Sequence, residues 1–528
     1  MTVLTVNPRL EDYEKAADFI EKWLKRSRRS NHIIRENMIV FEALFNDIIL
    51  KGFSEDTEIK IEVGHTVGNP VIRIGFAGKR YVPICADDLE ESIEYKIIKA
   101  YEDKLNYTYE ASYNVIRLSV TRSYVSHIVL CAIGLLAALL VYALLSHSVQ
   151  GAVGDQLVKN WVAPLETLFT AAMLMIGTPM TFFSILKNLL ETHVMAQQSS
   201  NARKLQPKTV TTSIWATALA ILFGLLIQRF LPQISGMFGD FAITGYTMKD
   251  LPQLISSLIP SDIFEPFRMI SPYALILLSL LIIAAMRSAG SQFDRLKNAV
   301  DACYVLFSKM LSLVILLLPL FCFLAFLHLL LENGYSALTG VALCWVLVLL
   351  GIVLLLGSYA LRLKIAGIPL GWFIKKSSPI LRENIFINSA IDATPFNIRQ
   401  CSRVFGIRRS ALEEVMPVLS QTNLDGNCFI IIAITMLLIG SSGVILPWWN
   451  YPMLAVLVLF LSFGAPNQPG SILIGVLIII NFLKIPEMLP VAIYCEVLLG
   501  TAQNFVNVTG NIVMTVIENR ESVSARIR

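Results

Sequence analysis

The sequence has little charge and no paired cysteines. Of its 528 residues only 16% are Asp, Glu, Lys or Arg and 55% are hydrophobic, whereas soluble chains carry about 25% charged residues. With a mean hydropathy of +0.63, most of the chain must be solvated by lipid rather than by water. The eight cysteines stand singly and read as small buried hydrophobes, so neither a disulfide framework nor a zinc site is predicted.

The chain also lacks a secretory signal at its start. Residues 1–26, MTVLTVNPRLEDYEKAADFIEKWLKR, contain no apolar core of the length that a signal peptide needs. We therefore expect the N-terminus to remain in the cytoplasm. Residues 1–120 hold many of the charges and are expected to form a soluble α+β domain. The net charge of +4 is modest and indicates no nucleic-acid partner.

From Ser123 onward apolar runs dominate, and a membrane span needs about 20 apolar residues. Towards the end of the chain the pattern becomes irregular. Residues 366–400 are half-polar, 413–443 form a clear span, 451–482 are split by GAPNQPG, and 488–516 carry many amides. Before these, six segments qualify as spans: roughly 124–146, 161–190, 211–231, 271–287, 304–331 and 337–361.

The basic residues give this layout an orientation. With the N-terminus inside, every cluster of Lys and Arg beyond the first span falls in the cytoplasm, as the positive-inside rule expects. Trp448 and Trp449 are expected at the external boundary, where indole rings prefer the interface. We expect a multi-pass protein of the cell membrane, inner or plasma, with both termini cytoplasmic and 521–528 as a tail. The orienting residues are Arg203, Lys204, Lys208, Arg287, Arg295, Lys297, Arg362, Lys364, Arg399, Arg403, Arg408, Arg409, Arg520, Arg526 and Arg528.

Two membrane segments are interrupted by Pro, Gly and small polar residues: NSAIDATP at 388–395 and SFGAPNQPG at 462–470. Irregular backbone at membrane depth is tolerated only where it is buried in protein or lines a cavity. A pair of such interrupted segments points to the binding site of a secondary transporter. Their free carbonyls can replace the hydration shell of a cation, and N–H groups at a half-helix start favour an anion.

Polar residues also recur within the last two spans. The stretch LSQTNLDGNCF places a carboxylate and a glycine directly before a long apolar run. On the final span, polar residues and one glycine recur at spacings of four, three, four and four, which is one face of a helix. Such a stripe must face protein or water, as part of a binding site or as interhelical hydrogen bonds. The stripe is Glu496, Gly500, Gln503, Asn507 and Asn511, and the earlier motif holds Asn423, Asp425, Gly426 and Asn427.

At these residues the chain resembles the dicarboxylate/amino acid:cation symporter family, which includes the glutamate transporters. The family's seventh-helix signature, Asn-Met-Asp-Gly-Thr, stands here as NLDGN at 423–427, and its eighth-helix signature, Val-Asn-Val-Thr-Gly-Asp, stands as VNVTGN at 506–511. The outer hairpin tip resembles 462–464 followed by Pro469 and Gly470. Segments 161–190 and 261–287 look like the second and fourth helices, so the likeness covers about 122–520.

The resemblance implies an α-helical polytopic membrane protein with eight transmembrane helices and two re-entrant hairpins, preceded by the cytoplasmic α+β domain. Residues 121–365 would hold the scaffold and the first six helices. Residues 366–520 would hold the hairpins with helices seven and eight, which form the substrate and ion site. The family assembles as a homotrimer in which a transport domain slides across the membrane like an elevator.

The resemblance also assigns site residues. Asn423 and Asp425 match a sodium site, the Asn507 carbonyl with Asn511 matches another, and the backbone of Ser462, Phe463 and Ala465 matches a third. No cofactor is implied beyond Na⁺ or H⁺ as the coupling ion. The substrate positions are Ser389, Ala390, Asn427, Ala465, Gly500, Gln503, Asn504 and Asn507.

Several family residues are replaced in this chain. The substrate-binding arginine is Gln503, the aspartate that holds a substrate amino group is Gly500, and a sodium-binding aspartate is Asn511. Losing a bidentate clamp and an ammonium partner disfavours glutamate or aspartate as substrate, and losing a carboxylate weakens one ion site. Glu496 is either a proton carrier with a perturbed carboxyl group or a satisfied structural carboxylate.

The N-terminal domain shows helical and strand patterns. NMIVFEALFNDIILKGF reads as an amphipathic helix, EIKIEVGH and PVIRIGFAG read as strands, and 93–122 suggest a helix and two more strands. The spacing of Glu42 and Asn46 resembles the ATP-binding fold of anti-sigma-factor kinases, in which these types activate water and hold magnesium. The Asp-x-Gly motif that binds adenine in that family is replaced here by Phe76-Ala77-Gly78. A degenerate nucleotide-binding or regulatory domain is therefore one interpretation, and plain α+β packing is the other.

Three hypotheses follow. The first is a symporter, not an enzyme, that couples Na⁺ or H⁺ to uptake of a small organic anion such as a dicarboxylate, or of an amino acid. The second is a membrane protein that senses a solute and signals through the N-terminal domain. The third, a membrane-anchored kinase, would require nucleotide and magnesium to bind within 1–120. The lone His328 is expected to be a packed or hydrogen-bonded residue rather than a ligand.

Overall fold

The computed structural model divides the chain into two compact units, Met1–Ser126 and His127–Arg528. We describe each unit by itself. The residues described are 2–26, 31–51, 57–66, 69–79, 81, 94, 97–98, 101, 105–110, 112–120, 124–148, 156–231, 252, 256, 258–288, 290–384, 389–391, 393–465, 470–483, 485 and 489–527.

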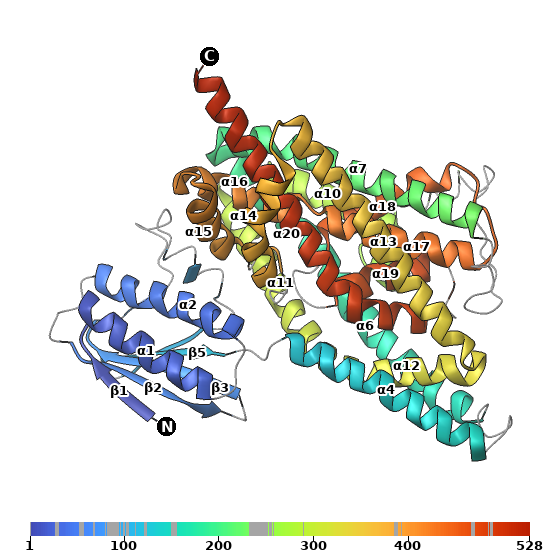
Figure 1. Cartoon of the computed structure of the whole chain (residues 1–528), viewed down its shortest axis with the longest axis horizontal. Helices are drawn as coiled ribbons and strands as arrows, with labels where there is room; N and C mark the ends of the chain where they lie inside the picture. Colours follow the sequence, from blue (N-terminus) through green and yellow to red (C-terminus); the bar gives the residue numbers. More distant parts are fainter. Residues whose placement is uncertain are drawn as a thin grey trace. The chain divides into compact units, whose positions relative to one another are not determined.

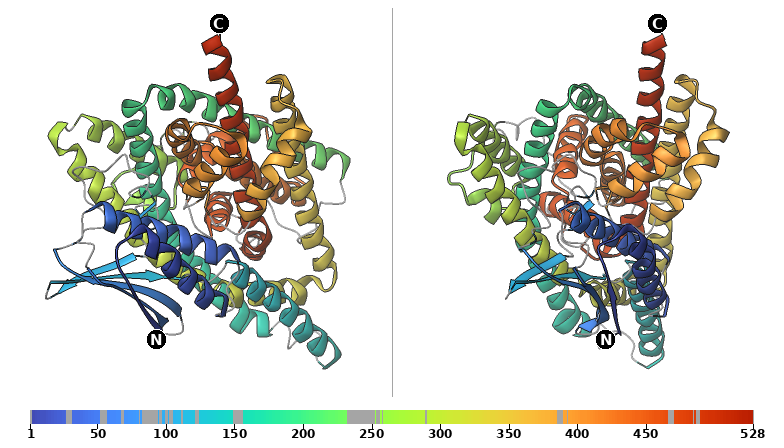
Figure 2. Two further views of the ribbon diagram at one scale, coloured as in Figure 1. Left: turned by 60° about the vertical axis from the view of Figure 1, so that its left-hand side comes forward. Right: turned by 90° about the vertical axis from the view of Figure 1, so that its left-hand side faces the viewer.

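The first unit is an antiparallel sheet of five strands with two helices on one face (Figures 1 and 2). Strands β2 (Ile59–Thr66) and β3 (Asn69–Ala77) lie where alternating residues predicted them, as do β4 (Leu105–Glu110) and β5 (Tyr113–Ser119). Strand β1 (Thr2–Val6) completes the order β1-β2-β3-β5-β4 and was not predicted from sequence. The helices are α1 (Leu10–Arg26) and α2 (Asn31–Leu50). Much of the helix predicted before β4 lies outside the described residues.

The core of this unit follows from strand alternation. In the sheet register Ile61 is paired with Ile74, and Ile74 with Ile116, so their side chains form one apolar row. This row packs against Phe41 and Phe45 of α2, which are fully buried. The amphipathic pattern that predicted the helix over 37–53 thus corresponds to the face of α2 that covers the sheet.

A buried polar group interrupts this core. The Tyr81 hydroxyl donates to the Asp47 carboxylate at 2.5 Å, and Lys51 forms an ion pair with the same carboxylate at 2.8 Å. Burial, reinforced by the Asp47 charge, raises the pKa of Tyr81 well above its ordinary value. The Tyr81 ring lies edge-on to Phe76, with ring centroids 5.6 Å apart. Phe76 is itself fully buried. The position at which the kinase family has its adenine-binding aspartate is therefore part of the apolar core here.

The second unit is a bundle of helices (Figure 1). Among the residues that the structure describes, five helical segments are long and apolar enough to cross a membrane: 158–197, 200–230, 293–315, 338–365 and 409–441. The chain is therefore a multi-pass membrane protein. In chain order, the described helices of this unit are α4 (Tyr124–Ser148), η2 (Val158–Val162), α6 (Ala163–Gln198), α7 (Ser200–Phe230), α9 (Glu265–Arg268), α10 (Pro272–Arg287), η4 (Gly290–Gln292), α11 (Phe293–Ile315), α12 (Leu318–Asn333), α13 (Ser336–Ile365), α14 (Leu370–Asn384), α15 (Thr394–Phe405), α16 (Arg409–Thr422), α17 (Asp425–Ser441), α18 (Asn450–Phe463), α19 (Ser471–Leu483) and α20 (Leu489–Ile527).

Two expectations about the spans are corrected. The continuous span expected over 304–331 is wrong, because α11 ends at Ile315 and α12 begins at Leu318, just before Pro319. Proline lacks the amide hydrogen that would continue the helix. The basic residues expected in a loop between spans two and three instead lie in the first turns of α7, which begins at Ser200.

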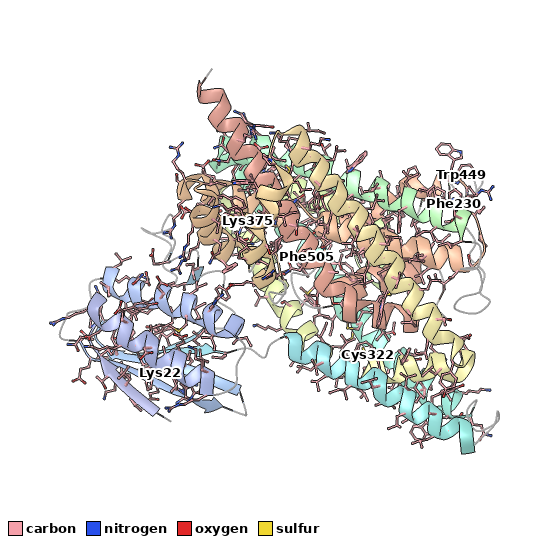
Figure 3. The ribbon with its side chains drawn as sticks, viewed as in Figure 1. Lys22, Phe230, Cys322, Lys375, Trp449 and Phe505 are labelled. Atoms are coloured by element: carbon pink, nitrogen blue, oxygen red, sulfur yellow. The ribbon has the colours of Figure 1, made fainter. Side chains whose placement is uncertain are left out.

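Helix α20 is the central element of the membrane unit. It packs on α12, α13, α16, α17 and α19, and its C-terminal part projects from the bundle in both views of Figure 2. Figure 3 places Lys375 of α14 towards one side of this unit and Trp449 with Phe230 towards the other. His328 of α12 is hydrogen-bonded, as expected: its Nδ1 contacts Glu166, and its Nε2 lies 3.2 Å from Glu332.

Replacing Tyr81 by Phe tests the polar contact in the N-terminal unit. We expect Tyr81→Phe to lower the local opening free energy of β2 and β3 by about 1–3 kcal/mol, because the buried Asp47 carboxylate loses a donor. Hydrogen exchange of the full-length protein measures this change. Tyr109→Phe is the control, since the Tyr109 hydroxyl makes an exposed contact with the Gly78 carbonyl at 3.3 Å; equal effects of the two substitutions would contradict the assignment.

Candidate functional site

The expected seventh span is broken at Asn423 and Leu424. Helix α16 ends at Thr422 and α17 begins at Asp425, and Leu424 between them has φ −106° and ψ 37°. Asp425 thus stands in the first turn of α17, where the helix dipole favours a negative charge. Nearly all of α17 is buried, so the broken backbone is enclosed by protein, as membrane depth requires.

Gly426 allows α17 to approach α20 closely. A Cβ built at this glycine would lie 2.5 Å from the Gln503 carbonyl oxygen and 2.8 Å from Asn507 Oδ1. The Gly426 N–H instead donates to Asn507 Oδ1 at 2.8 Å. This contact supplies a partner for an amide that the break leaves without one, and it explains why a glycine follows Asp425.

Asp425 is fully buried and receives donors from several helices. Its Oδ1 accepts from Ser213 of α7 at 3.1 Å, and its Oδ2 accepts from the Tyr359 hydroxyl of α13 at 3.0 Å. The hydrogen-bonding groups around Asn423 fix the orientation of its amide. The amide nitrogen donates to Asp425 Oδ1 at 3.1 Å and to the Thr212 hydroxyl at 2.9 Å. The carboxylate is therefore held by side chains of α7 and α13 and by the residue at the break itself.

Amide side chains connect α17 with the stripe on α20. Asn427 Oδ1 accepts from Gln503 Nε2 at 2.5 Å and from Asn507 Nδ2 at 2.7 Å. Gln503 Oε1 accepts from Ser471, the first residue of α19, at 3.0 Å. All four side chains are more than nine-tenths buried. Phe505 marks the level of this cluster on α20 in Figure 3.

The first interrupted segment consists of α14 and α15, which contact one another. Asn384 ends α14; its Nδ2 donates to Asn397 Oδ1 at 2.8 Å, and its carbonyl accepts from Asn504 of α20 at 3.4 Å. Ser389 and Ala390 are buried at the interruption. Residues 388 and 392 of the predicted tip, and 385–387 before it, lie outside the described residues. Through Asn384 this segment therefore reaches α20 at Asn504, the residue next to Gln503 of the polar stripe.

The second interrupted segment consists of α18 and α19. The two Glu496 oxygens accept from the Gly470 and Leu473 amides at 2.8 and 2.9 Å, so the carboxylate caps the start of α19. These contacts favour the structural interpretation of Glu496 over the proton carrier. The Phe463 carbonyl accepts from Asn188 of α6 at 2.5 Å. Residues 466–469 of the predicted tip lie outside the described residues.

The structure brings most of the predicted site residues together and leaves some apart. The motif at 423–427 and the stripe of α20 share direct hydrogen bonds, whereas the Ser389 hydroxyl accepts locally from Ile391 at 3.2 Å. The Ser462 hydroxyl accepts from Cys428 of α17 at 3.2 Å, and the Ala465 carbonyl accepts from Ser184 at 3.5 Å. Gly500 lies on α20 without a side chain to contribute. Glu42 and Asn46 lie on α2 of the other unit, half-buried, and their roles stay predictions.

Sequence reasoning missed the groups that surround Asp425. Thr212 and Ser213 belong to the hydroxyl-rich run TVTTS at 209–213, at the start of an apolar span, and such residues also occur in ordinary helix packing. Arg362 was expected in a cytoplasmic loop, but it lies within the last turn of α13, and its Nη1 is 4.0 Å from Asp425 Oδ2. The spacing of Tyr359 and Arg362, three residues apart on one helix face, is the sequence signal that could have found them.

Comparison with known proteins bears on this arrangement. The model of the sodium:dicarboxylate symporter family matches residues 126–521. A C4-dicarboxylate transport protein of Rhizobium johnstonii is 22% identical over 376 residues, which cover 68% of this chain and 82% of that protein. The matched region includes every helix that contributes to the polar cluster.

The close approach at Gly426 generates a prediction. Gly426→Ala should destabilise the membrane unit by about 1–3 kcal/mol, because the added methyl group must displace α20 or the Asn507 side chain. Thermal unfolding of the detergent-solubilised chain measures the effect. Gly357→Ala is the matched control, since a Cβ at Gly357 meets nothing within 4 Å, and it should be neutral or slightly stabilising. The account fails if the two substitutions shift the midpoint alike.

Proposed function

The chain belongs to the sodium:dicarboxylate symporter family, and we propose that it carries a small dicarboxylate across the cell membrane by cation symport. Family membership implies a transporter rather than an enzyme. The observation that supports this proposal best is the buried polar cluster at the break between α16 and α17. There Asp425, Asn427, Gln503 and Asn507 meet within one helix bundle.

The composition of the cluster favours a dicarboxylate over an amino acid. Its substrate-facing groups are amides, Asn427, Gln503, Asn504 and Asn507, which can donate to carboxylate oxygens. In this proposal the substrate carboxylates take over donors that now bond within the cluster, such as the Gln503 Nε2 hydrogen held by Asn427. Gly500 offers no carboxylate to an ammonium group, so a substrate amino group would lack its partner. The relative's name, C4-dicarboxylate transport protein, agrees with this substrate class.

The proposed mechanism is movement of a transport domain against a scaffold, within a homotrimer. In this proposal α7 and α13 move with α17, because Ser213 and Tyr359 hold the Asp425 carboxylate. The moving part would therefore include two helices that the sequence boundary at 365 assigned with the scaffold. Helix α6 would belong to the scaffold, and its contact from Asn188 to Phe463 would break during each cycle.

The coupling ion in this proposal is Na⁺ or H⁺. The sodium positions that the resemblance assigns are Asp425 and the Asn507 carbonyl, which belong to the cluster, and the backbone of the second interrupted segment, where Ala465 and Ser462 contact α6 and α17 instead. The N-terminal unit would act on transport from the cytoplasm as a regulatory or nucleotide-sensing domain, with Glu42 and Asn46 of α2 as the candidate nucleotide residues. The second hypothesis, a sensor that binds solute without carrying it, rests on this appended unit.

Uptake by proteoliposomes tests the proposal. Full-length protein should accumulate radiolabelled succinate when a sodium or proton gradient is imposed. Asp425→Asn should reduce uptake about tenfold or more, because a charged group worth about 1.5–3 kcal/mol in hydrogen bonding is lost from a fully buried site. Asp301→Asn is the matched control, since Asp301 pairs with Lys297 within α11, at 2.8 Å, and should leave uptake unchanged.

Two results would count against the proposed function. If no gradient drives uptake while succinate still raises the unfolding midpoint, the chain is a sensor. If an amino acid competes with succinate better than other dicarboxylates do, the substrate assignment is wrong.

A further inference from the structure

Arg362 brings a fixed positive charge to the buried carboxylate. Its guanidinium carbon lies 5.3 Å from the centre of the Tyr359 ring, and Nη1 lies 4.0 Å from Asp425 Oδ2. Tyr359 donates to the same carboxylate oxygen at 3.0 Å. Arg362 Nη1 is buried and has no hydrogen-bond partner among the described residues. The side chain as a whole is 21% exposed, whereas Asp425 is 0% exposed, so the arginine reaches inward from the last turn of α13.

The charges around Asp425 balance without an added ion. The other groups that contact its oxygens, Ser213, Tyr359 and Asn423, are neutral donors. A buried carboxylate needs a compensating positive charge, and Arg362 is the cation that lies within 4.0 Å of it. A sodium ion bound to Asp425 would lie beside a guanidinium of the same sign, and the Ser213 and Tyr359 hydroxyls would have to turn their hydrogens away from the carboxylate.

The second expected sodium position also holds a donor. Asn511 stands where the family has an aspartate. In the orientation that satisfies its neighbours, the Asn511 amide nitrogen lies 3.3 Å from the Asn507 carbonyl oxygen and 3.2 Å from the Leu419 carbonyl oxygen. Those carbonyls would be sodium ligands only if they faced an open space. Here a neutral amide stands where the family has a carboxylate, so this position offers a cation no negative charge.

The third expected position consists of backbone carbonyls, which carry no net charge. Its carbonyls belong to Phe463 and Ala465, and they accept from Asn188 Nδ2 at 2.5 Å and from Ser184 Oγ at 3.5 Å. Both donors come from α6. The residues present therefore fit sodium poorly at the three positions: the Asp425 carboxylate already faces the charge of Arg362, and the second and third positions offer neutral oxygens.

We propose that Arg362 is a built-in counter-cation for Asp425 and that this protein binds its substrate without sodium. The inference rests on the proposed function and narrows it, since symport by this chain would then use the proton as its coupling ion. Arg362 acts as a specificity-determining residue. Its positive charge compensates the Asp425 carboxylate in place of sodium and so excludes sodium from that position.

Sodium-dependent stability of the purified full-length chain tests this proposal. The unfolding midpoint is measured in sodium chloride and in choline chloride at equal concentration, without substrate. The wild type should unfold at the same temperature in both salts. Arg362→Met should gain a sodium-specific rise of about 2 °C or more, since an ion that binds the folded state stabilises it. Adding Asp425→Asn to Arg362→Met should abolish that rise.

Two further variants separate charge from packing. Arg362→Lys keeps a cation and should remain insensitive to sodium. Lys364→Met removes an exposed basic residue two positions along the same helix and should behave as the wild type. A monodisperse Arg362→Met that stays insensitive to sodium overturns the proposal.

The wild type decides the question even if Arg362→Met does not fold. Saturable binding of radioactive sodium to the wild type, or a sodium-specific rise in its unfolding midpoint, would contradict the proposal. Because these measurements use no substrate, they are independent of the transport assay. Succinate uptake driven by sodium would refute this inference while leaving dicarboxylate symport intact, whereas failure of all uptake would refute the proposed function alone.

Discussion

The membrane unit depends on one constraint: a carboxylate buried at a helix break must find all of its partners inside the protein. Asp425 is fully buried, and water cannot compensate its charge at membrane depth. Its partners come from α7 and α13, and the backbone beside it is joined to α20 by the contact of Gly426 with Asn507. Three helices far apart in sequence are thereby fixed around one point, and the two interrupted segments close on the same cluster.

Helix α20 makes further buried polar contacts along the bundle. The polar residues of its stripe and the adjacent Asn504 contact three neighbouring helices: Glu496 caps α19, Gln503 and Asn507 hold α17, and Asn504 reaches α14. The stripe is therefore both interhelical hydrogen bonding and the lining of a candidate site, two interpretations that the sequence had offered as alternatives. A ligand that enters must exchange these internal bonds for its own, which gives an amide-lined site its selectivity.

The sequence predicted the features that are local and missed those that depend on tertiary contact. The α20 stripe and strands β2 and β3 follow from residue spacing, because periodicity acts within one segment. The break between α16 and α17 was missed, because the sequence predicted one continuous span over 413–443. The division of 304–331 into two helices was missed, since a proline near the middle of an apolar run is also tolerated inside membrane helices. Arg362 was misplaced for a different reason. Basic residues at span ends usually lie in the cytoplasm, and only the path of α13 past α17 turns this side chain inward.

A double-mutant cycle on Asp425 and Arg362 tests the central claim, that the buried carboxylate is balanced by the protein itself. Unfolding free energies of the wild type, Asp425→Asn, Arg362→Met and the double variant are compared in sodium-free buffer. The account predicts that each single substitution leaves a charge unpaired, and that the double variant is more stable than the sum of the two losses by about 1 kcal/mol or more. Strictly additive losses would mean that the two charges do not compensate one another, and the account would be wrong.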